Sequence, residues 1–209
     1  MTGWHIRNDL LLNPNKTEAI ITGTHQQIAK FDQSAGIKVS GTTVPFSSKL
    51  RVLGVTLDSR LSFDDHVTSV VQACNYHIRA LRHIRHLIDR EMANIIACSI
   101  VFSKLDYCNA ILYGATGRNI DRLQRVQNSL ARVVCEAPYR SRTTRLRRSL
   151  HWLPIRQRIQ YKIASMTFKV RLHHQPVYLS GLVVEHSQSR TLRSANRNQA
   201  VLIVPRTKT

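Results

Sequence analysis

Features that mark several familiar protein classes are missing from this chain. Its 209 residues include four cysteines, Cys74, Cys98, Cys108 and Cys135, and none forms a Cys-x-x-Cys pair, so a zinc site is not expected. Each cysteine falls within an apolar or helical pattern, which predicts small buried thiols in a reducing compartment. The longest largely apolar stretch, 93–102, is far shorter than the roughly 20 residues of a membrane span. With no signal-peptide pattern either, we expect a cytoplasmic and/or nuclear protein, neither secreted nor in a membrane.

Acidic residues are scarce in the last third of the chain. Up to Glu136 there are 16 Lys and Arg against 11 Asp and Glu, whereas from Ala137 onward 15 Lys and Arg stand against Glu185 alone. The formal net charge of +19 attracts polyanions, of which nucleic acid is the commonest. An anionic membrane surface, or a charge excess in a sequence under weak selection, would explain the same composition. Charge alone favours nucleic acid.

Short extended segments are predicted in the N-terminal part. Runs rich in β-branched residues at 19–22, 37–40 and 43–44 are bounded by turn residues, and 50–57 roughly alternates around Gly54. These patterns predict a small antiparallel sheet built from hairpins.

From Ser62 the apolar period becomes helical. Ser62 is a candidate N-cap, and Asp64 and Asp65 follow in the first turn, where carboxylates favour the helix dipole. Apolar residues then recur at three- and four-residue steps. The second helix is apolar nearly all round and is expected to be central. Further helix starts are expected at Asp89, at Asn119 and at Pro154, with Trp152 packing against the last of them.

Arginines recur at three- and four-residue steps on two of these predicted helices. The first set is Arg79, Arg82 and Arg90, with His86 between the last two, and the second is Arg118, Arg122, Arg125 and Arg132. Forked guanidinium donors at this spacing suit successive phosphates. An ordinary solvated helix face is an equally weighted alternative, since Asp121 lies four residues before Arg125 and could pair with it.

A denser run of arginines lies in the segment 139–149, which is predicted to be a loop. Its members are Arg140, Arg142, Arg145, Arg147 and Arg148. A phosphate-gripping loop, a nuclear-import signal and a disordered segment all remain open. No base-reading motif accompanies the run, so sequence-tolerant binding is expected.

Several short motifs carry a resemblance to a known family. They lie at residues 13–18, 53–58, 105–109 with 123–128, and 150–154. In this order they resemble the back half of the reverse transcriptase of LINE-type (non-LTR, jockey-like) retrotransposons, over nearly the whole chain. The resemblance implies a mainly α fold with a small antiparallel β region at the N-terminus.

The resemblance also implies a division of the chain into four parts. Residues 1–61 would be a palm remnant with β-hairpins, 62–137 a helical thumb-like region, and 138–184 a basic loop and post-thumb helix. Residues 185–209 form a basic tail whose low apolar content predicts disorder. Lys16 matches the family's lysine near the incoming nucleotide's phosphates. Leu53, Gly54 and Val55 match the hairpin that holds the primer end.

The family's catalytic carboxylates hold two Mg²⁺ ions and come from motifs ahead of the position matched by Trp4. The resemblance therefore implies a reverse transcriptase fragment that is not an enzyme as it stands, with no cofactor or metal and with Lys16 as a vestige. Asp64 and Asp65 follow an aromatic residue, Phe63, but their place in a first helical turn favours helix stabilisation over a metal site.

Two functional hypotheses follow. In the first, the chain binds RNA or DNA without base specificity, as a template–primer duplex, with a palm-containing polypeptide as a further partner and no membrane. In the alternative, it is a non-functional, aggregation-prone product of a decayed element, because apolar faces that once met the palm would be exposed.

Overall fold

The structure is a computed structural model that describes residues 7–8, 13–32, 35–184 and 202–203. The predicted tail 185–209 lies outside the described residues except for Leu202 and Ile203. The N-terminal elements are the 3-10 helix η1 (Pro14–Lys16), α2 (His25–Ile28), β1 (Ile37–Val39) and β2 (Thr42–Val44). The antiparallel β1–β2 hairpin confirms one predicted pair of strands. The run at 19–22 is not a strand, and within it Ala19 makes a single parallel bridge to Phe46.

A second antiparallel hairpin, β3 (Lys49–Val52) with β4 (Val55–Asp58), forms where the alternating pattern predicted it. Leu53 and Gly54 make its two-residue turn with φ values of 46° and 81°. Positive φ at both turn residues matches the twist of the strands, and Gly54 adopts it without steric cost. The Tyr107 hydroxyl donates to the Leu53 carbonyl at 2.6 Å, so the turn is held against the helical part of the chain.

The start of the first long helix, α3 (Asp64–Ile84), differs from the prediction. Its N-cap position is Phe63, in a left-handed conformation, rather than Ser62. The organising group is the Asp58 carboxylate, which accepts from the backbone N–H groups of Arg60, Ser62 and Phe63 at 2.8 to 3.1 Å. Desolvation raises the pKa of Asp58, but these hydrogen bonds outweigh it and hold the pKa below its ordinary value.

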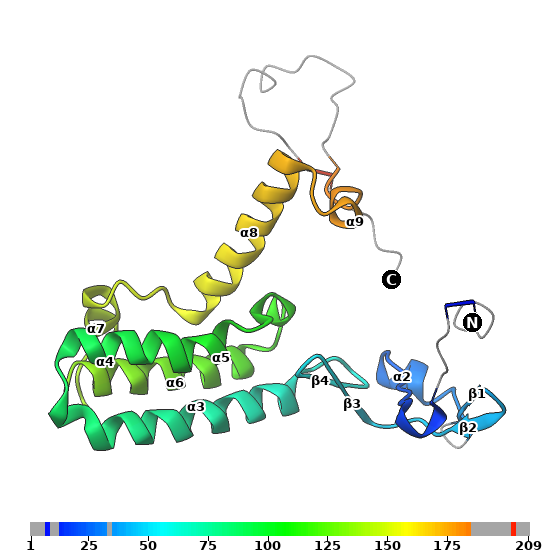
Figure 1. The fold of residues 1–209 in the computed structure, drawn as a ribbon, viewed down its shortest axis with the longest axis horizontal. Coiled ribbons are helices and arrows are strands. Elements are labelled where there is room, and N and C mark those ends of the chain that lie inside the picture. The colour runs from blue at the N-terminus through cyan, green and yellow to red at the C-terminus, as the bar shows by residue number, and fades with distance from the viewer. Residues whose placement is uncertain (1–6, 9–12, 33–34, 185–201, 204–209) are drawn as a thin grey trace, which may run out of the picture.

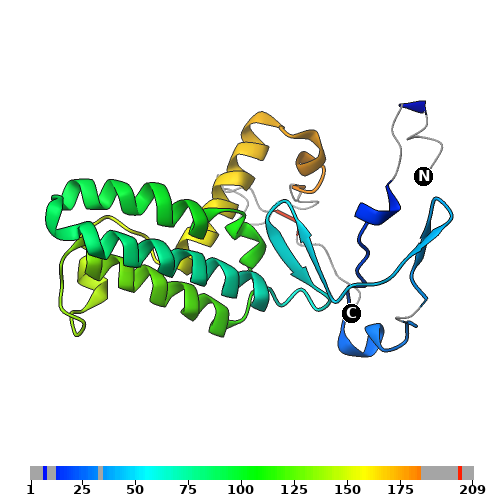
Figure 2. The same ribbon diagram turned by 60° about the horizontal axis from the view of Figure 1, so that its bottom comes forward.

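The rest of the chain is helical, which confirms the predicted fold class of mainly α with a small antiparallel β region. After α3 come η2 (Arg85–Leu87), α4 (Arg90–Ile96), the π-helical η3 (Ala97–Phe102), α5 (Ser103–Asp106), η4 (Asn109–Leu112), α6 (Gly117–Val134), α7 (Thr143–Ser149), α8 (Ile155–His173) and α9 (Val177–Ser180). Helices α3, α4–α5 and α6 lie side by side as a bundle (Figure 1). Figure 2 shows the β3–β4 hairpin at the bundle end where α3 begins, with β1–β2 farther out.

The core is built from the apolar stripes that the helical period predicted. It includes Val67, Cys74, Ile78 and Leu81 of α3 and Ile120, Leu123, Val126 and Leu130 of α6, all at most 7% exposed. These stripes face each other because residues three and four apart share one face of a helix.

Several local predictions were wrong. Asp89 caps α4 as expected, but Thr116 rather than Asn119 caps α6, and Asn119 turns inward instead. The second helix is not surrounded by protein, since Met92 is 47% and Ile95 52% exposed. The segment 139–149 is not wholly a loop, because it contains α7.

The cysteines are less buried than expected. Cys74 is buried, and desolvation raises the pKa of its thiol to about 11, so it stays neutral. Cys98 and Cys108 are exposed, because they lie on the outer side of the π-helix and in the turn before η4. No helix in the described part of the chain has the length and apolar character needed to cross a bilayer.

Candidate nucleic-acid interface

One face of α6 carries four of the predicted arginines. Arg118, Arg122, Arg125 and Arg132 are separated by steps of four, three and seven residues, which place them in one row. At a rise of 1.5 Å per residue the row spans about 21 Å. The opposite face of α6 is buried in the core, so the helix is held with this row outward.

Helix α3 borders the row on one side. The Arg122 guanidinium donates to the Thr68 hydroxyl at 2.7 Å, which joins the two helices near their N-terminal ends. Beyond this bond a hollow of about 250 Å³ lies between Val71 and Asn75 of α3 and Arg125 on α6. Arg122 is thus partly committed to structure, whereas Arg125 is exposed.

Farther along the same two helices lies a groove of about 430 Å³. Its cations include Arg82 from α3 and Arg132 from α6. The Arg132 guanidinium lies 5.1 Å from the ring centroid of Tyr139, which is itself 86% exposed. The acid in the groove, Glu136, forms an ion pair with Arg85 at 3.3 Å, so its charge is compensated within the protein.

Arg85 was not predicted to have a role, and it is a structural residue. It is 7% exposed and donates from Nε and Nη2 to the Val134 carbonyl at 3.1 and 2.9 Å, and from Nη1 to the Ile88 carbonyl at 2.6 Å. These bonds satisfy the last carbonyl of α6, at Val134, and the carbonyl of Ile88 just after η2. The sequence contained the signal, since Arg85 falls on the apolar stripe four residues after Leu81.

Helix α7 borders the row on its other side. The Arg147 guanidinium donates to the Asn128 amide oxygen of α6, and burial lowers the pKa of Arg147. Successive helical residues are about 100° apart, so Val126, which faces α3, and Asn128 point about 160° apart on the side of α6 that carries the arginine row, and the row lies between them. Arg90 at the start of α4 donates to the Ser149 hydroxyl at 2.7 Å and holds the end of α7.

The structure therefore gathers most of the predicted arginines around α6. The exposed ones are Arg79, Arg82, Arg90, Arg118, Arg125, Arg140, Arg142, Arg145 and Arg148, and the partly buried ones are Arg122, Arg132 and Arg147. We call these residues on α3, α6 and α7, with Arg90 and the segment before α7, the arginine surface.

The other predicted site residues lie elsewhere. Lys16 is exposed at the end of η1, in the N-terminal part. Leu53 is 84% exposed at the hairpin tip, Gly54 is exposed beside it, and Val55 is buried. Gly54 at the hairpin tip and His66 both line a hollow of about 320 Å³. Burial lowers the pKa of the His66 imidazole.

The motifs that carry the family resemblance serve packing. Asp106 pairs with Arg158 of α8, whose guanidinium also lies 4.2 Å from the Phe102 ring centroid. Trp152 packs edge-on against the same ring at 4.7 Å, and its indole N–H donates to Asn94 at 3.1 Å. The prediction that Trp152 packs at the helix start is confirmed.

The α6 motif makes the matching contacts to the start of α8. The Gln127 amide donates to the Leu153 carbonyl at 2.8 Å, and Gln124 accepts from the Ile155 N–H at 3.0 Å. Residues 105–109, 123–128 and 150–158 thus meet at one junction.

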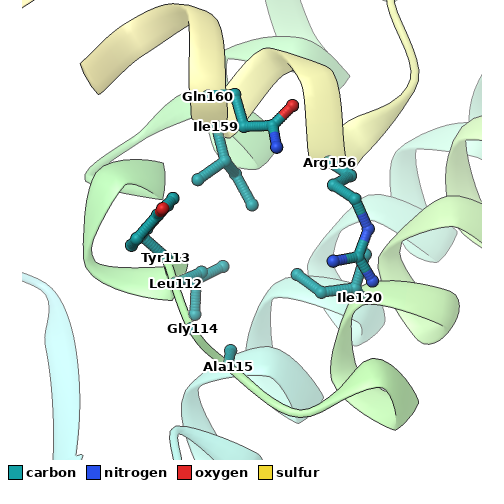
Figure 3. Close-up of a pocket in the computed structure, with 8 residues that line it drawn as sticks. All are labelled: Leu112, Tyr113, Gly114, Ala115, Ile120, Arg156, Ile159 and Gln160. Atoms are coloured by element: carbon teal, nitrogen blue, oxygen red, sulfur yellow. The ribbon is translucent and has the colours of Figure 1, made fainter. Parts of the chain in front are cut away.

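A pocket of about 280 Å³ opens between the loop after η4 and α8. Figure 3 shows Ile159 of α8 pointing into it opposite Leu112, with Ile120 on the α6 side. Arg156 and Gln160 supply the polar groups of the pocket. Arg156 is a further exposed cation that the periodicity argument missed, although the basic character of the chain beyond Ala137 could have indicated it.

The paired aspartates are engaged in structure. Both lie in the first turn of α3, as predicted. Asp64 accepts from the Asn119 amide at 2.7 Å, and Asp65 pairs with Lys49 at 2.9 Å. Within the described ranges there is no group of three or more His, Cys, Asp and Glu side chains placed to hold a metal ion.

No protein-family model matches the chain, and no solved structure matches it. The chain is, however, related to an RNA-directed DNA polymerase of a transposon. That relative is the probable RNA-directed DNA polymerase from transposon BS of Drosophila melanogaster, to which this chain is 26% identical over 180 residues. The match covers 83% of this chain and 19% of the relative's length. It confirms the resemblance to a reverse transcriptase, while the assignments of thumb and palm remnant stay predictions.

Proposed function

We propose that this part of a reverse transcriptase binds template–primer duplexes through the arginine surface, without base specificity. The observation that carries the proposal is the row on α6, which has guanidinium groups of α3 on one side and of α7 on the other. Ordinary solvated helix faces mix charges of both signs, whereas α6 carries one acid, the exposed Asp121, beside its row of four arginines. Glu136, an acid bordering this surface, is paired with the buried Arg85.

The dimensions and chemistry of the row suit a nucleic-acid backbone. A row of about 21 Å has the length of about six base-pair steps of a duplex, measured along its axis at 3.4 Å per step. Arginine forks bind phosphate oxygens whatever the base sequence, and such contacts position a duplex rather than read it. Binding should therefore weaken steeply with salt and vary little with sequence.

The described residues do not fit the two Mg²⁺ ions of the parent family. Asp64 and Asp65 are committed to Asn119 and Lys49 respectively. We propose that nucleotidyl transfer needs carboxylates from a palm outside these residues, and that a palm-containing polypeptide is a partner. Primer extension on an RNA template with Mg²⁺ should then show no incorporation by this chain alone. Reproducible incorporation would overturn that part of the proposal. Cytoplasmic and/or nuclear localisation remains part of this proposal.

The test of binding uses an RNA–DNA heteroduplex and the variant R118Q/R125Q, in which both substituted side chains are exposed. Removing one arginine–phosphate interaction should lower the slope of log affinity against log salt by about 0.9, so the double variant should lower it by about 1.8. The control K30Q/K38Q removes the same charge from exposed positions in the N-terminal part and should leave the slope nearly unchanged. An equal decrease in both variants would mean that only net charge matters.

A second candidate is the non-functional, self-associating product. Its supporting observation is the exposure of large apolar side chains: Leu87 of η2 is 72% exposed, and Met92 and Ile95 of α4 are 47% and 52% exposed. Exposed patches of this kind favour association. Sedimentation in 0.5 M salt, where nucleic acid is released, separates the two candidates. A monomer that binds heteroduplex at low salt supports the first. Concentration-dependent aggregates that bind no heteroduplex at low salt support the second.

A further inference from the structure

Helix α8 carries two apolar stripes, and the structure buries only one of them. Ile155 and Ile159 are 3% exposed against α6 and η4, and Ile163 packs against the edge of the same core. The other stripe contains Tyr161, Phe168 and Leu172, which are 66%, 64% and 60% exposed. In Figure 1 the second half of α8 extends beyond the bundle.

The exposed stripe is regular. Tyr161 and Phe168 are seven residues apart, close to two helical turns, so their rings lie on one face about 10 Å apart along the axis. Leu172 continues the same face one turn later. A separation of about 10 Å corresponds to three steps of stacked bases at 3.4 Å each.

The charge of α8 is entirely positive. The helix contains five Lys and Arg residues and no acid: Arg156, Arg158, Lys162, Lys169 and Arg171. Arg158 is compensated by Asp106. Lys162 and Lys169 are exposed, and each follows a residue of the exposed stripe directly, so the lysines repeat with the same seven-residue spacing as the rings.

We propose that this face of α8 binds single-stranded nucleic acid, with bases stacked on Tyr161 and Phe168 and phosphates contacted by Lys162 and Lys169. Aromatic rings beside cations are the means by which proteins hold single strands without reading their sequence. A duplex keeps its bases stacked internally, so this face favours an unpaired strand. The proposal shares no residue with the arginine surface, and each can therefore fail without the other.

The test compares the whole chain with its Y161A/F168A variant, using a 20-nucleotide poly-U strand and a blunt heteroduplex as separate probes. Loss of a base–aromatic stack weakens binding at least about fivefold per ring, so the single-strand affinity should fall at least about 20-fold. The heteroduplex affinity should stay within twofold. Conversely, R118Q/R125Q should weaken heteroduplex binding more than single-strand binding.

Two control variants separate stacking from general apolar docking. Leu172→Ala removes an exposed apolar side chain from the same face without removing a ring, and single-strand affinity should stay within twofold. Tyr161→Phe keeps a ring and should retain binding. An unchanged affinity in Y161A/F168A, or an equal decrease in Leu172→Ala, overturns the proposal. The proposal is also overturned if Y161A/F168A loses binding to phosphatidylserine vesicles while its single-strand binding stays intact, because the face would then bind membranes.

Discussion

The two sides of α6 use polar residues in opposite ways. On the side facing the start of α8, Gln124 and Gln127 are bonded to backbone groups of that segment. On the other side, the row that includes Arg118 and Arg125 faces solvent. The side whose motifs carry the resemblance to reverse transcriptases is thus occupied by intramolecular bonds, and the side without a recognisable motif has exposed arginines available for a ligand.

The difference has a physical origin. A buried amide must find specific partners, because leaving it unpaired costs about 1–3 kcal/mol, and this ties it to particular neighbours at particular positions. Contact with phosphates requires only positive charge within reach, which many arrangements of arginine supply. Short motifs therefore indicate the packed side, and charge periodicity indicates the side proposed to bind nucleic acid.

The largest effect should be a difference in unfolding free energy between two arginine variants whose positions lie about one helical turn apart. Arg85→Met leaves the Val134 carbonyl without its two donors and should destabilise the fold by about 3 kcal/mol. Arg82→Met, at an exposed position three residues earlier, should change stability by less than about 0.5 kcal/mol. Urea denaturation of both variants measures the difference. Similar unfolding free energies would show that the buried arginine is not structural.

A smaller effect is expected on the motif side of α6. Gln127 is fully buried, and Gln127→Met keeps the volume but leaves the Leu153 carbonyl unpaired. The loss of stability should be about 1–3 kcal/mol. The matched control is Gln157→Met on exposed α8 surface, where little change is expected. If heteroduplex affinity fell in Gln127→Met at temperatures where it is fully folded, the division between the two sides would be wrong.

The smallest effect concerns pH. His66 is 5% exposed, and burial lowers its pKa from 6.5, so the folded state binds its proton less readily than the unfolded state. The contribution of neutral His66 to the free energy of unfolding is fully present above pH 6.5 and is lost as pH falls through 6.5 towards the lowered pKa. Its slope cannot exceed about 1.4 kcal/mol per pH unit. His66→Gln should flatten the dependence between pH 7 and 5, and His83→Gln, at an exposed position, should not. A wild-type slope retained in His66→Gln would contradict this assignment.

Much of the fold could be predicted, because both hairpins and the stripes of α3, α6 and α8 follow from hydrophobic period. What could not be predicted depended on contacts between distant residues. Asn119 and Thr116 are both good capping residues, and Asn119 is held inward by Asp64 and the Ser62 carbonyl, which lie across the helix pair and far away in sequence. Helix α7 has no long apolar stripe. Hydrogen bonds from Arg147 to Asn128 and from Arg90 to Ser149 hold it against the bundle.

The candidate site was predictable residue by residue but not as an assembly. The four-three-seven spacing placed the α6 arginines in one row. Nothing in the sequence showed that α3 and α7 border that row, or that Arg85 neutralises Glu136 beside it. The exposed apolar stripe of α8 was not separated from the buried one, because a search for a single periodic face does not distinguish two apolar stripes on one helix.

The division between the two sides of α6 is tested most directly by measuring heteroduplex affinity and urea stability on the same two variants. R118Q/R125Q should lower the salt slope by about 1.8 while its unfolding free energy stays within about 0.5 kcal/mol of wild type. Gln127→Met should lose stability and keep the slope. The division would be contradicted if R118Q/R125Q kept the wild-type salt slope, or if folded Gln127→Met showed a lowered salt slope.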